Sequence, residues 1–303
     1  MKRRTYLLTG SAVALTAGCI GGNDADDGDG DDTDDSGDDT GDDTADDSSA
    51  DNGPDPADDD DTSTREAIGP VPETAIHQWV FDSRDDETVV DLIGGADGTV
   101  HGELENVAGE WQAGYAEYAA PDSGGHIDLG YLDSLISAIS DRMITLFATV
   151  EPEQIADERP MTILGAGGGE SHWFEFRLSN SDGSYAGQPM ILLRDSAGQT
   201  IRTVADDPVE IDTPTRIVTQ VSGDRAEDVA FWIDGERADS TSLSDDEVTG
   251  RVEPAQSFGL FASNPQSPDT IGTRRFFSGT IDNVIVCDAP ITEGEIADDY
   301  DGM

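Results

Sequence analysis

The sequence predicts an all-β fold, a sandwich of two antiparallel sheets with short peripheral helices. Residues 173–178 alternate between apolar and other side chains with a period of two, as a strand with one face in a core requires. Glycine-rich turns separate further short apolar runs, which is typical of sheets built from hairpins. Ile233-Asp234-Gly235 follows an aromatic run and carries the Asp-Gly pair that strongly predicts a tight hairpin.

The other elements follow from the same patterns in chain order. β-branched and apolar residues predict strands at residues 143–150, 161–164, 173–178, 189–194, 215–221 and 281–286. Residues 124–130 are predicted to form a turn followed by a strand. Apolar residues at 132, 135, 136 and 139 have a helical spacing, so one short surface helix is expected there.

A second short helix is expected at the C-terminal end. Ala289-Pro290 ends the last strand, because proline cannot donate to the ladder. Thr292 stands three residues ahead of Glu295, which is the spacing of a capping box at a helix start. Ile296 and Tyr300, four residues apart, give this helix an apolar side.

This C-terminal stretch resembles a known family. An aromatic residue, a glycine and a hydrophobe-Asp pair begin the pattern, at Phe277, Gly279 and Ile281-Asp282. After the strand come a small-Pro-hydrophobe triplet, a Glu-Ile pair and a tyrosine, at Ala289-Pro290-Ile291, Glu295-Ile296 and Tyr300. In that order it is similar to the final strand and helix of the laminin G-like domains of the concanavalin A-like lectin and glucanase superfamily. Residues 76–102, with Trp79 and Asp91, resemble the family's first strand and loop, and 214–238 its central pair. The resemblance covers 75–302 and implies a jelly-roll sandwich.

The superfamily includes retaining glucanases, so a catalytic carboxylate pair has to be sought. Such a pair lies on one face of one strand, with the carboxyl groups about 5 to 5.5 Å apart. The nearest pattern is Glu210-Ile211-Asp212, but no third carboxylate follows and Pro214 interrupts the strand. We therefore interpret Glu210 and Asp212 as solvated loop residues and expect no enzymatic activity.

The charge balance restricts the partners and the environment of the protein. The chain has 66 acidic and 16 basic residues, a net charge of −50, which argues against nucleic acid as a partner. Such a charge repels itself in dilute buffer, whereas salt near 1 M shortens the Debye length to about 3 Å. Lys2 is the only lysine. These features predict an extreme halophile of archaeal type; the alternative is an ordinary acidic secreted protein.

The N-terminal part predicts export and lipid anchoring. Residues 1–19 have a basic start, a short apolar core and small residues before Cys19. Arg3-Arg4 resembles a twin-arginine signal, and residues 16–19 resemble a lipobox that leaves Cys19 lipidated. Residues 20–74 are rich in Asp, Gly and Thr and predict a disordered tether, followed by a sandwich domain at 75–303. The expected location is the extracellular face of the cell membrane.

Metal and cofactor sites find little support in the sequence. The four histidines, at 77, 101, 126 and 172, show no zinc-ligand spacing. Many laminin G-like domains bind calcium, so calcium is possible here, with Asp128 and Asp195 at plausible strand ends. No ligand pair can be transferred from the family, so the metal is not assigned and no cofactor is required.

The candidate ligand-binding residues are Trp173, Glu175, Arg177 and Trp232. Alternation places Phe174, Phe176, Phe231 and Ile233 in the core, so the four candidates point out of the sandwich. Exposed tryptophans usually mark a binding surface. The alternative is that a loop such as 181–187 covers them and makes a small second core.

Three functions remain open. The first is a lipid-anchored cell-surface module that binds a glycan or a glycosylated surface protein. The second is a structural envelope protein without a small ligand, and the third a carbohydrate-active hydrolase with an unusual site. Fold alone cannot decide among them, because one sandwich carries many functions.

Overall fold

The structure is a computed structural model of the chain. The structure describes residues 70–81, 88–101, 104–107, 115–118, 125–156, 160–167, 173–181, 183–254, 257–262 and 277–302. Every described residue belongs to one compact unit, Asp61–Met303. The predicted signal peptide, Cys19 and nearly all of the predicted tether lie outside the described residues.

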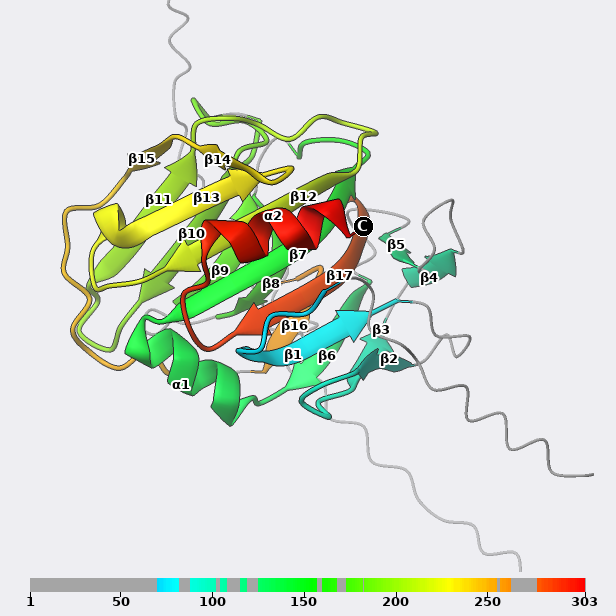
Figure 1. The fold of residues 1–303 in the computed structure, drawn as a ribbon, viewed down its shortest axis with the longest axis horizontal. Helices are drawn as coiled ribbons and strands as arrows, with labels where there is room; N and C mark the ends of the chain where they lie inside the picture. The colour runs from blue at the N-terminus through cyan, green and yellow to red at the C-terminus, as the bar shows by residue number, and fades with distance from the viewer. Residues whose placement is uncertain are drawn as a thin grey trace, which may run out of the picture. The chain divides into compact units, whose positions relative to one another are not determined.

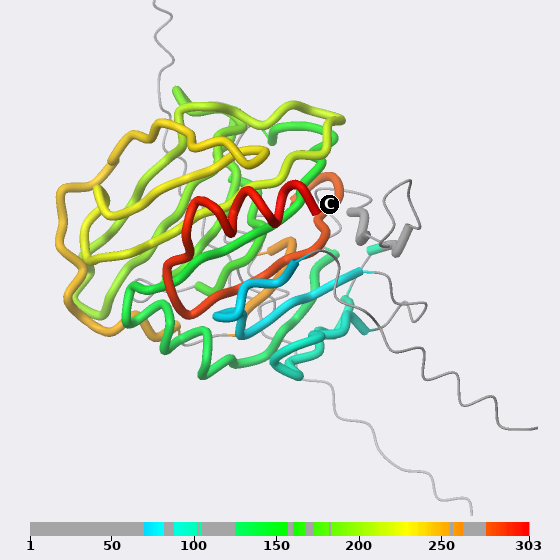
Figure 2. The backbone as a smooth tube through the Cα atoms, viewed as in Figure 1, coloured from blue at the N-terminus to red at the C-terminus, as the bar shows by residue number. Residues whose placement is uncertain are grey.

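The described chain forms an antiparallel β-sandwich with two short helices, as predicted (Figure 1). Sheet A contains, in spatial order, β14 (Glu236–Ala238), β13 (Val229–Ile233), β12 (Thr215–Val221), β7 (Ile144–Pro152), β17 (Gly279–Cys287), β1 (Ala75–Val80) and β2 (Thr88–Asp91). One end of β17 also pairs with β5 (Tyr115–Tyr118), which pairs with β4 (Leu104–Val107). The first and last strands are therefore neighbours, as Figure 2 shows for β1 and β17.

Sheet B continues from β2, which pairs with both sheets. Its order is β2, β3 (Gly98–His101), β6 (His126–Gly130), β16 (Phe258–Leu260), β8 (Met161–Ala166), β9 (Trp173–Leu178), β10 (Pro189–Arg194), β11 (Thr200–Ala205) and β15 (Ser240–Ser242). Because β2 belongs to both sheets, the sandwich is curved and nearly closed on that side. The 3₁₀ helix η1 (Ala226–Asp228) precedes β13.

The core lies between the two sheets, where alternation predicts it. Phe174 and Phe176 of β9 and Phe231 of β13 are fully buried in one large cluster. Phe174 packs edge to face against Phe258 of β16, with ring centroids 6.1 Å apart. Burial of large aromatic side chains contributes about 1.5 to 3 kcal/mol each to the stability of such a core.

The predicted Asp-Gly hairpin joins β13 to β14. Asp234 and Gly235 have φ angles of 51° and 76°, so both central residues are left-handed, as the tight turn between twisted antiparallel strands requires. Asp234 also accepts a hydrogen bond from the backbone N–H of Arg216, at 2.9 Å. This contact ties the turn to β12.

Helix α2 (Glu293–Asp301) lies on the outer face of sheet A, over β7 and β12 (Figure 1). Thr292 and Glu295 form the predicted capping box. The buried side of the helix consists of Ile296 and Asp299, whereas Tyr300 is 41% exposed, so Tyr300 is not the apolar residue that the spacing predicts.

A buried ion pair fastens α2 to the sheet. Arg216 of β12 binds Asp299 through two parallel hydrogen bonds of 2.9 Å. The same guanidinium donates to the carbonyl of Asn283 at 2.7 Å and lies over the ring of Phe147. A bidentate guanidinium–carboxylate pair is geometrically specific, so it fixes the position of the helix.

Helix α1 (Asp133–Asp141) lies where the apolar spacing predicts a helix. Leu135, Ile136 and Ile139 face the core and are fully buried. The helix ends at Arg142, which has a left-handed φ of 55°. Such a left-handed residue is a common helix stop.

Candidate functional site

The face of sheet B that points away from the core carries a continuous row of residues in cross-strand register. From β3 to β11 the row consists of Thr99, Asp128, Gly259, Gly165, Glu175, Leu192 and Arg202. Their chain neighbours, such as Ile127 and Leu260, point into the core. We call this surface the outer face of sheet B.

Trp173 lies beside this row at the start of β9. Its indole rests on Gly167, where a Cβ atom would come within 2.7 Å of Nε1 and 2.8 Å of Cδ1. Any side chain at position 167 would therefore displace the ring. Trp173 is half-buried, so part of a large aromatic surface is accessible next to a glycine-lined stretch of sheet.

Glu175 and Arg177 lie on the outer face, but the prediction that they are open to solvent is wrong. Their side chains are 0% and 4% exposed and form an ion pair with each other. The prediction failed because alternation assigns the face of a strand and carries no information about what lies over that face. A paired guanidinium and carboxylate are mutually neutralised.

Trp232 does not share a face with Trp173, which corrects the predicted site. It belongs to β13 in sheet A, where it is 4% exposed in a second apolar cluster with Phe147 and Ile296 beneath α2. It does point away from the main core, as alternation predicts. Arg237 covers it, with the guanidinium carbon 5.7 Å from the ring centroid. Trp232 therefore packs against α2 and is not part of the outer face of sheet B.

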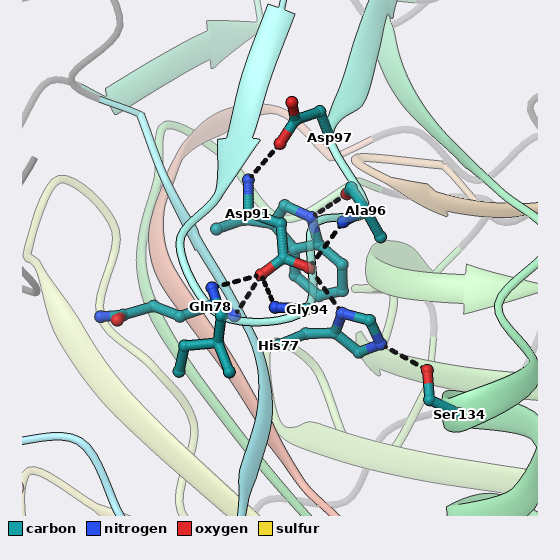
Figure 3. A network of polar contacts seen from close by, with 9 residues as sticks. His77, Gln78, Asp91, Gly94, Ala96, Asp97 and Ser134 are labelled. Atoms are coloured by element: carbon teal, nitrogen blue, oxygen red, sulfur yellow. Dashed lines mark hydrogen bonds and ion pairs between the residues drawn. The ribbon is translucent and has the colours of Figure 1, made fainter. Parts of the chain in front are cut away.

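Asp91, which the family resemblance places in the first loop, organises a buried polar network (Figure 3). Its two carboxylate oxygens accept hydrogen bonds from the backbone N–H groups of Gln78 and Ala96, at 3.0 Å each, and from others in the loop. Nδ1 of His77 donates to Oδ2 of Asp91 at 2.6 Å, and Nε2 of His77 lies 2.7 Å from the hydroxyl of Ser134.

The network determines the ionisation of Asp91. Burial alone would raise the pKa of Asp91, but hydrogen bonds from His77, Gln78, Gly94 and Ala96 outweigh it and lower the pKa to about 2. A carboxylate that accepts this many hydrogen bonds is fully occupied. Asp91 therefore holds the loop and first helix in place and is not a free acid or base.

The carboxylates considered for calcium have backbone partners. Asp195 is fully buried and accepts hydrogen bonds of 2.9 Å from the N–H groups of Ala197, Gln199 and Gly250. Asp128 accepts one from Gly130. Within the described ranges, no group of three or more His, Cys, Asp or Glu side chains could hold a metal ion.

The described carboxylates on the outer face are far apart. Glu175 and Asp128 belong to the same row but are separated by β8 and β16. Three strand spacings of about 4.8 Å place them roughly 14 Å apart. Glycosidase pairs are about 5 to 9.5 Å apart, so these two residues do not form one. Glu210 and Asp212 are exposed, in the segment between β11 and β12.

The comparisons with known proteins concern the fold. The sequence matches no protein-family model and no curated protein. Domain 4 of AbnA, a GH43 extracellular arabinanase from Geobacillus stearothermophilus solved with arabinotriose, is 18% identical with a TM-score of 0.52, over 74% of this chain and 97% of that domain. The binding domain of botulinum neurotoxin DC, in complex with SialylT, is 10% identical with a TM-score of 0.52, over 76% of this chain and 51% of that one.

The fold is similar to that of these two domains. Trypanosoma rangeli sialidase, solved as a covalent intermediate with 2,3-difluorosialic acid, is similar over 76% of this chain and 33% of its own length, at 14% identity and a TM-score of 0.51. This chain therefore spans about half of the neurotoxin domain and a third of the sialidase. At these identities the likeness shows the fold.

Sequence reasoning missed two arginines on the outer face. Arg194 of β10 is the cross-strand neighbour of Trp173, and Arg202 of β11 belongs to the row itself. The sequence predicts the strand at residues 189–194 but not its register with β9, because register depends on pairing between separate strands. With that register, the period of two would have placed Arg194 beside Trp173.

Two other features lie apart from this face. A hollow of about 450 Å³ at the end of α1 is lined by Ser137, Ser140, Asp141, Arg142, Thr249, Gly250 and Arg251. None of these residues belongs to the row on the outer face of sheet B.

Cys287 of β17 is buried, and desolvation raises the pKa of its thiol to about 12, so it is an unreactive packing residue.

Proposed function

We propose that this protein is a lipid-anchored, non-catalytic cell-surface module that binds glycans on the outer face of sheet B. The observation that carries the proposal is the half-buried Trp173, whose indole rests on Gly167 beside a glycine-lined sheet surface. An aromatic ring on such a surface offers a stacking platform for the apolar face of a sugar ring. Aromatic side chains with a few polar groups are typical of ligand sites.

The fold likeness supports this class of ligand. The arabinanase domain was solved with arabinotriose and the neurotoxin binding domain with SialylT. A glycan partner is consistent with both. The 14 Å separation estimated from strand spacing for Glu175 and Asp128 favours binding over hydrolysis on this face.

A glycan array probed in multimolar KCl tests the proposal. The wild-type protein and the variant Trp173→Ala should be applied to the same array, with Trp232→Phe as a control in the packing cluster under α2. We expect wild type and Trp232→Phe to bind the same glycans and Trp173→Ala to bind none of them. Absence of binding by the wild-type protein, or unchanged binding by Trp173→Ala, would show that the outer face of sheet B is not a glycan site.

The proposed cell-surface location rests on the N-terminal sequence, with Arg3-Arg4 and Cys19 as its markers. In the part of the chain that the structure describes, neither helix is long and apolar enough to cross a membrane. Under the proposal, the lipid on Cys19 provides attachment.

Fractionation of cells that express Cys19→Ser tests the anchor. The variant should appear in the medium or persist as an uncleaved precursor, because it lacks the sulfur that carries the lipid. A variant that is cleaved normally and still sediments with membranes would contradict the lipoprotein assignment. Cys287→Ser is the matched control and should remain in the membrane fraction.

A further inference from the structure

Carboxylates outnumber the arginines of this chain, yet two arginines on the outer face of sheet B have no ion-pair partner in the part of the chain that the structure describes. The chain has about four acidic residues for each basic one, 66 against 16. Five described arginines pair with a carboxylate: Arg177, Arg216, Arg225, Arg237 and Arg251. Arg142 donates to the carbonyls of Ser140 and Gly250.

Arg194 and Arg202 are the exceptions. Among the described residues, no carboxylate lies within ion-pair distance of either guanidinium, and Nε of Arg194 is buried without a hydrogen-bond partner. Asp246, an acidic residue beside β11, accepts a hydrogen bond from the backbone N–H of Thr200 at 3.1 Å. Among the described residues, the positive charge of these two arginines therefore has no ion-pair partner.

Their register places them next to the proposed sugar platform. Arg194 is directly opposite Trp173 on the neighbouring strand, and its other neighbour is Thr200. Arg202 is opposite Leu192 and thus diagonal to Arg194. Direct cross-strand neighbours have Cβ atoms about 5 Å apart and diagonal ones about 7 to 8 Å, so both guanidinium groups can reach one bound oligosaccharide.

We propose that Arg194 and Arg202 make the glycan site selective for anionic oligosaccharides, those carrying uronate carboxylates or sulfate esters. This inference rests on the proposed glycan binding and names the class of ligand. A guanidinium group binds carboxylate or sulfate oxygens through two parallel hydrogen bonds. A sugar stacked on Trp173 would direct an acidic substituent toward Arg194, and the next acidic unit toward Arg202.

High salt does not remove this selectivity. At about 1 M salt the Debye length is roughly 3 Å, so charges beyond contact range are screened. Ion pairs in direct contact persist, because each charge-assisted hydrogen bond still contributes to the binding free energy when salt has screened the long-range attraction. The net charge of −50 repels anions only over the longer, screened range.

The test is a calorimetric titration of the full-length protein in about 2 M KCl, where screening is strong. The probes are a galacturonate oligosaccharide, its fully methyl-esterified form, an oligomeric dextran sulfate and the uncharged dextran of equal length. We expect an anionic oligosaccharide to bind at least about tenfold more tightly than its neutral counterpart, as one charge-assisted pair implies. The uronate and sulfate arms identify which acidic group is recognised.

Variants assign the selectivity to the two arginines. Arg194→Gln and Arg202→Gln should each reduce the preference for the anionic form about tenfold, because each lowers the affinity for the anionic form more than the affinity for the neutral form. Arg225→Gln, which removes a half-exposed arginine elsewhere, is the matched control and should behave as wild type.

The outcomes separate this inference from the proposed function. Equal affinity for charged and neutral forms would overturn the anionic selectivity while glycan binding stands. Binding of inorganic sulfate as tightly as the sulfated oligosaccharide would also overturn it, since the sugar would then contribute nothing. If neither these probes nor any arrayed glycan binds the wild-type protein, the proposed function itself fails.

Discussion

Asp91 shows how one residue stabilises the start of the sandwich. Its carboxylate accepts hydrogen bonds from His77 and from the loop backbone, and these hold its pKa at about 2, against an ordinary value of 3.8. A depressed carboxyl pKa contributes stability that is present above the unfolded-state pKa and lost as pH falls through the folded-state pKa. For Asp91 the window is therefore between about pH 4 and pH 2, and the contribution at neutral pH is about 2 kcal/mol.

The variant Asp91→Asn tests this contribution. It keeps the shape but removes the charge, so we expect a loss of about 2 kcal/mol in the free energy of unfolding at pH 7. The difference from wild type should shrink as pH falls from 4 to 2, where wild-type Asp91 also becomes neutral. Chemical denaturation at constant salt across this range measures it. A difference that does not change with pH would show that the charge of Asp91 is irrelevant to stability.

The sequence predicts the faces of individual residues better than their exposure. Phe174 and Phe176 are in the core as alternation requires, and Glu175 and Arg177 are on the opposite face. Their burial was not predictable, because it depends on tertiary contacts that a strand's own period does not encode. The role of Arg194 required the register of β9 with β10, which is a non-local property.

At the scale of elements, helix α2 is held by one buried ion pair as well as by its apolar side. Ile296 is its buried hydrophobic residue, and Asp299, although charged, is 2% exposed against Arg216. The capping box Thr292–Glu295 was predictable from a local motif. The Arg216–Asp299 pair was not, because its members are 83 residues apart.

The variant Asp299→Ala tests how α2 is fastened. Removing one partner leaves Arg216 buried and unpaired, so we expect a loss of about 3 to 5 kcal/mol in unfolding free energy. Glu293→Ala on the same helix is the control, because its pair with Arg237 is exposed, and it should cost less than about 1 kcal/mol. Equal effects of the two variants in denaturant titrations would refute a special role for the buried pair.

Short and irregular strands account for part of what the sequence did not predict at this scale; the regular six-residue strand β11 was also not predicted. The strands β8, β9, β10 and β12 begin at the predicted residues. β16 contains only Phe258–Leu260 with a central glycine, and β15 only Ser240–Ser242, so neither has a period to detect. Both exist because neighbouring strands supply their hydrogen bonds.

For the whole molecule, the sequence predicts the sandwich. It does not predict that the two outward-pointing tryptophans lie on different sheets. Trp173 and Trp232 both point away from the main core, and both alternations were correct. They belong to different sheets, and which sheet a strand joins is decided by pairing partners distant in sequence. The site therefore contains Trp173 alone of the two.

The net charge predicts a salt requirement for the whole fold. Self-repulsion among carboxylates destabilises a compact state, and raising salt from about 0.1 M to 1 M shortens the Debye length from roughly 10 Å to 3 Å. We expect Tm to rise steeply with KCl and the fold to loosen below roughly 0.5 M salt. Thermal melts in KCl, with sucrose as an uncharged stabilising control, measure this. A Tm that responds to sucrose and not to KCl would contradict the halophilic interpretation.

The central claim, that the outer face of sheet B binds a glycan through Trp173, is tested most directly by measuring affinity and stability together for Trp173→Ala. A glycan that binds wild type is titrated calorimetrically into the variant, and Tm is recorded on the same sample. The account predicts that binding is lost while Tm falls by less than removal of a fully buried tryptophan would cause, because part of Trp173 is exposed. A loss of 3 kcal/mol or more, roughly the cost of emptying a packed site, together with retained binding would contradict it and show that Trp173 is a core residue.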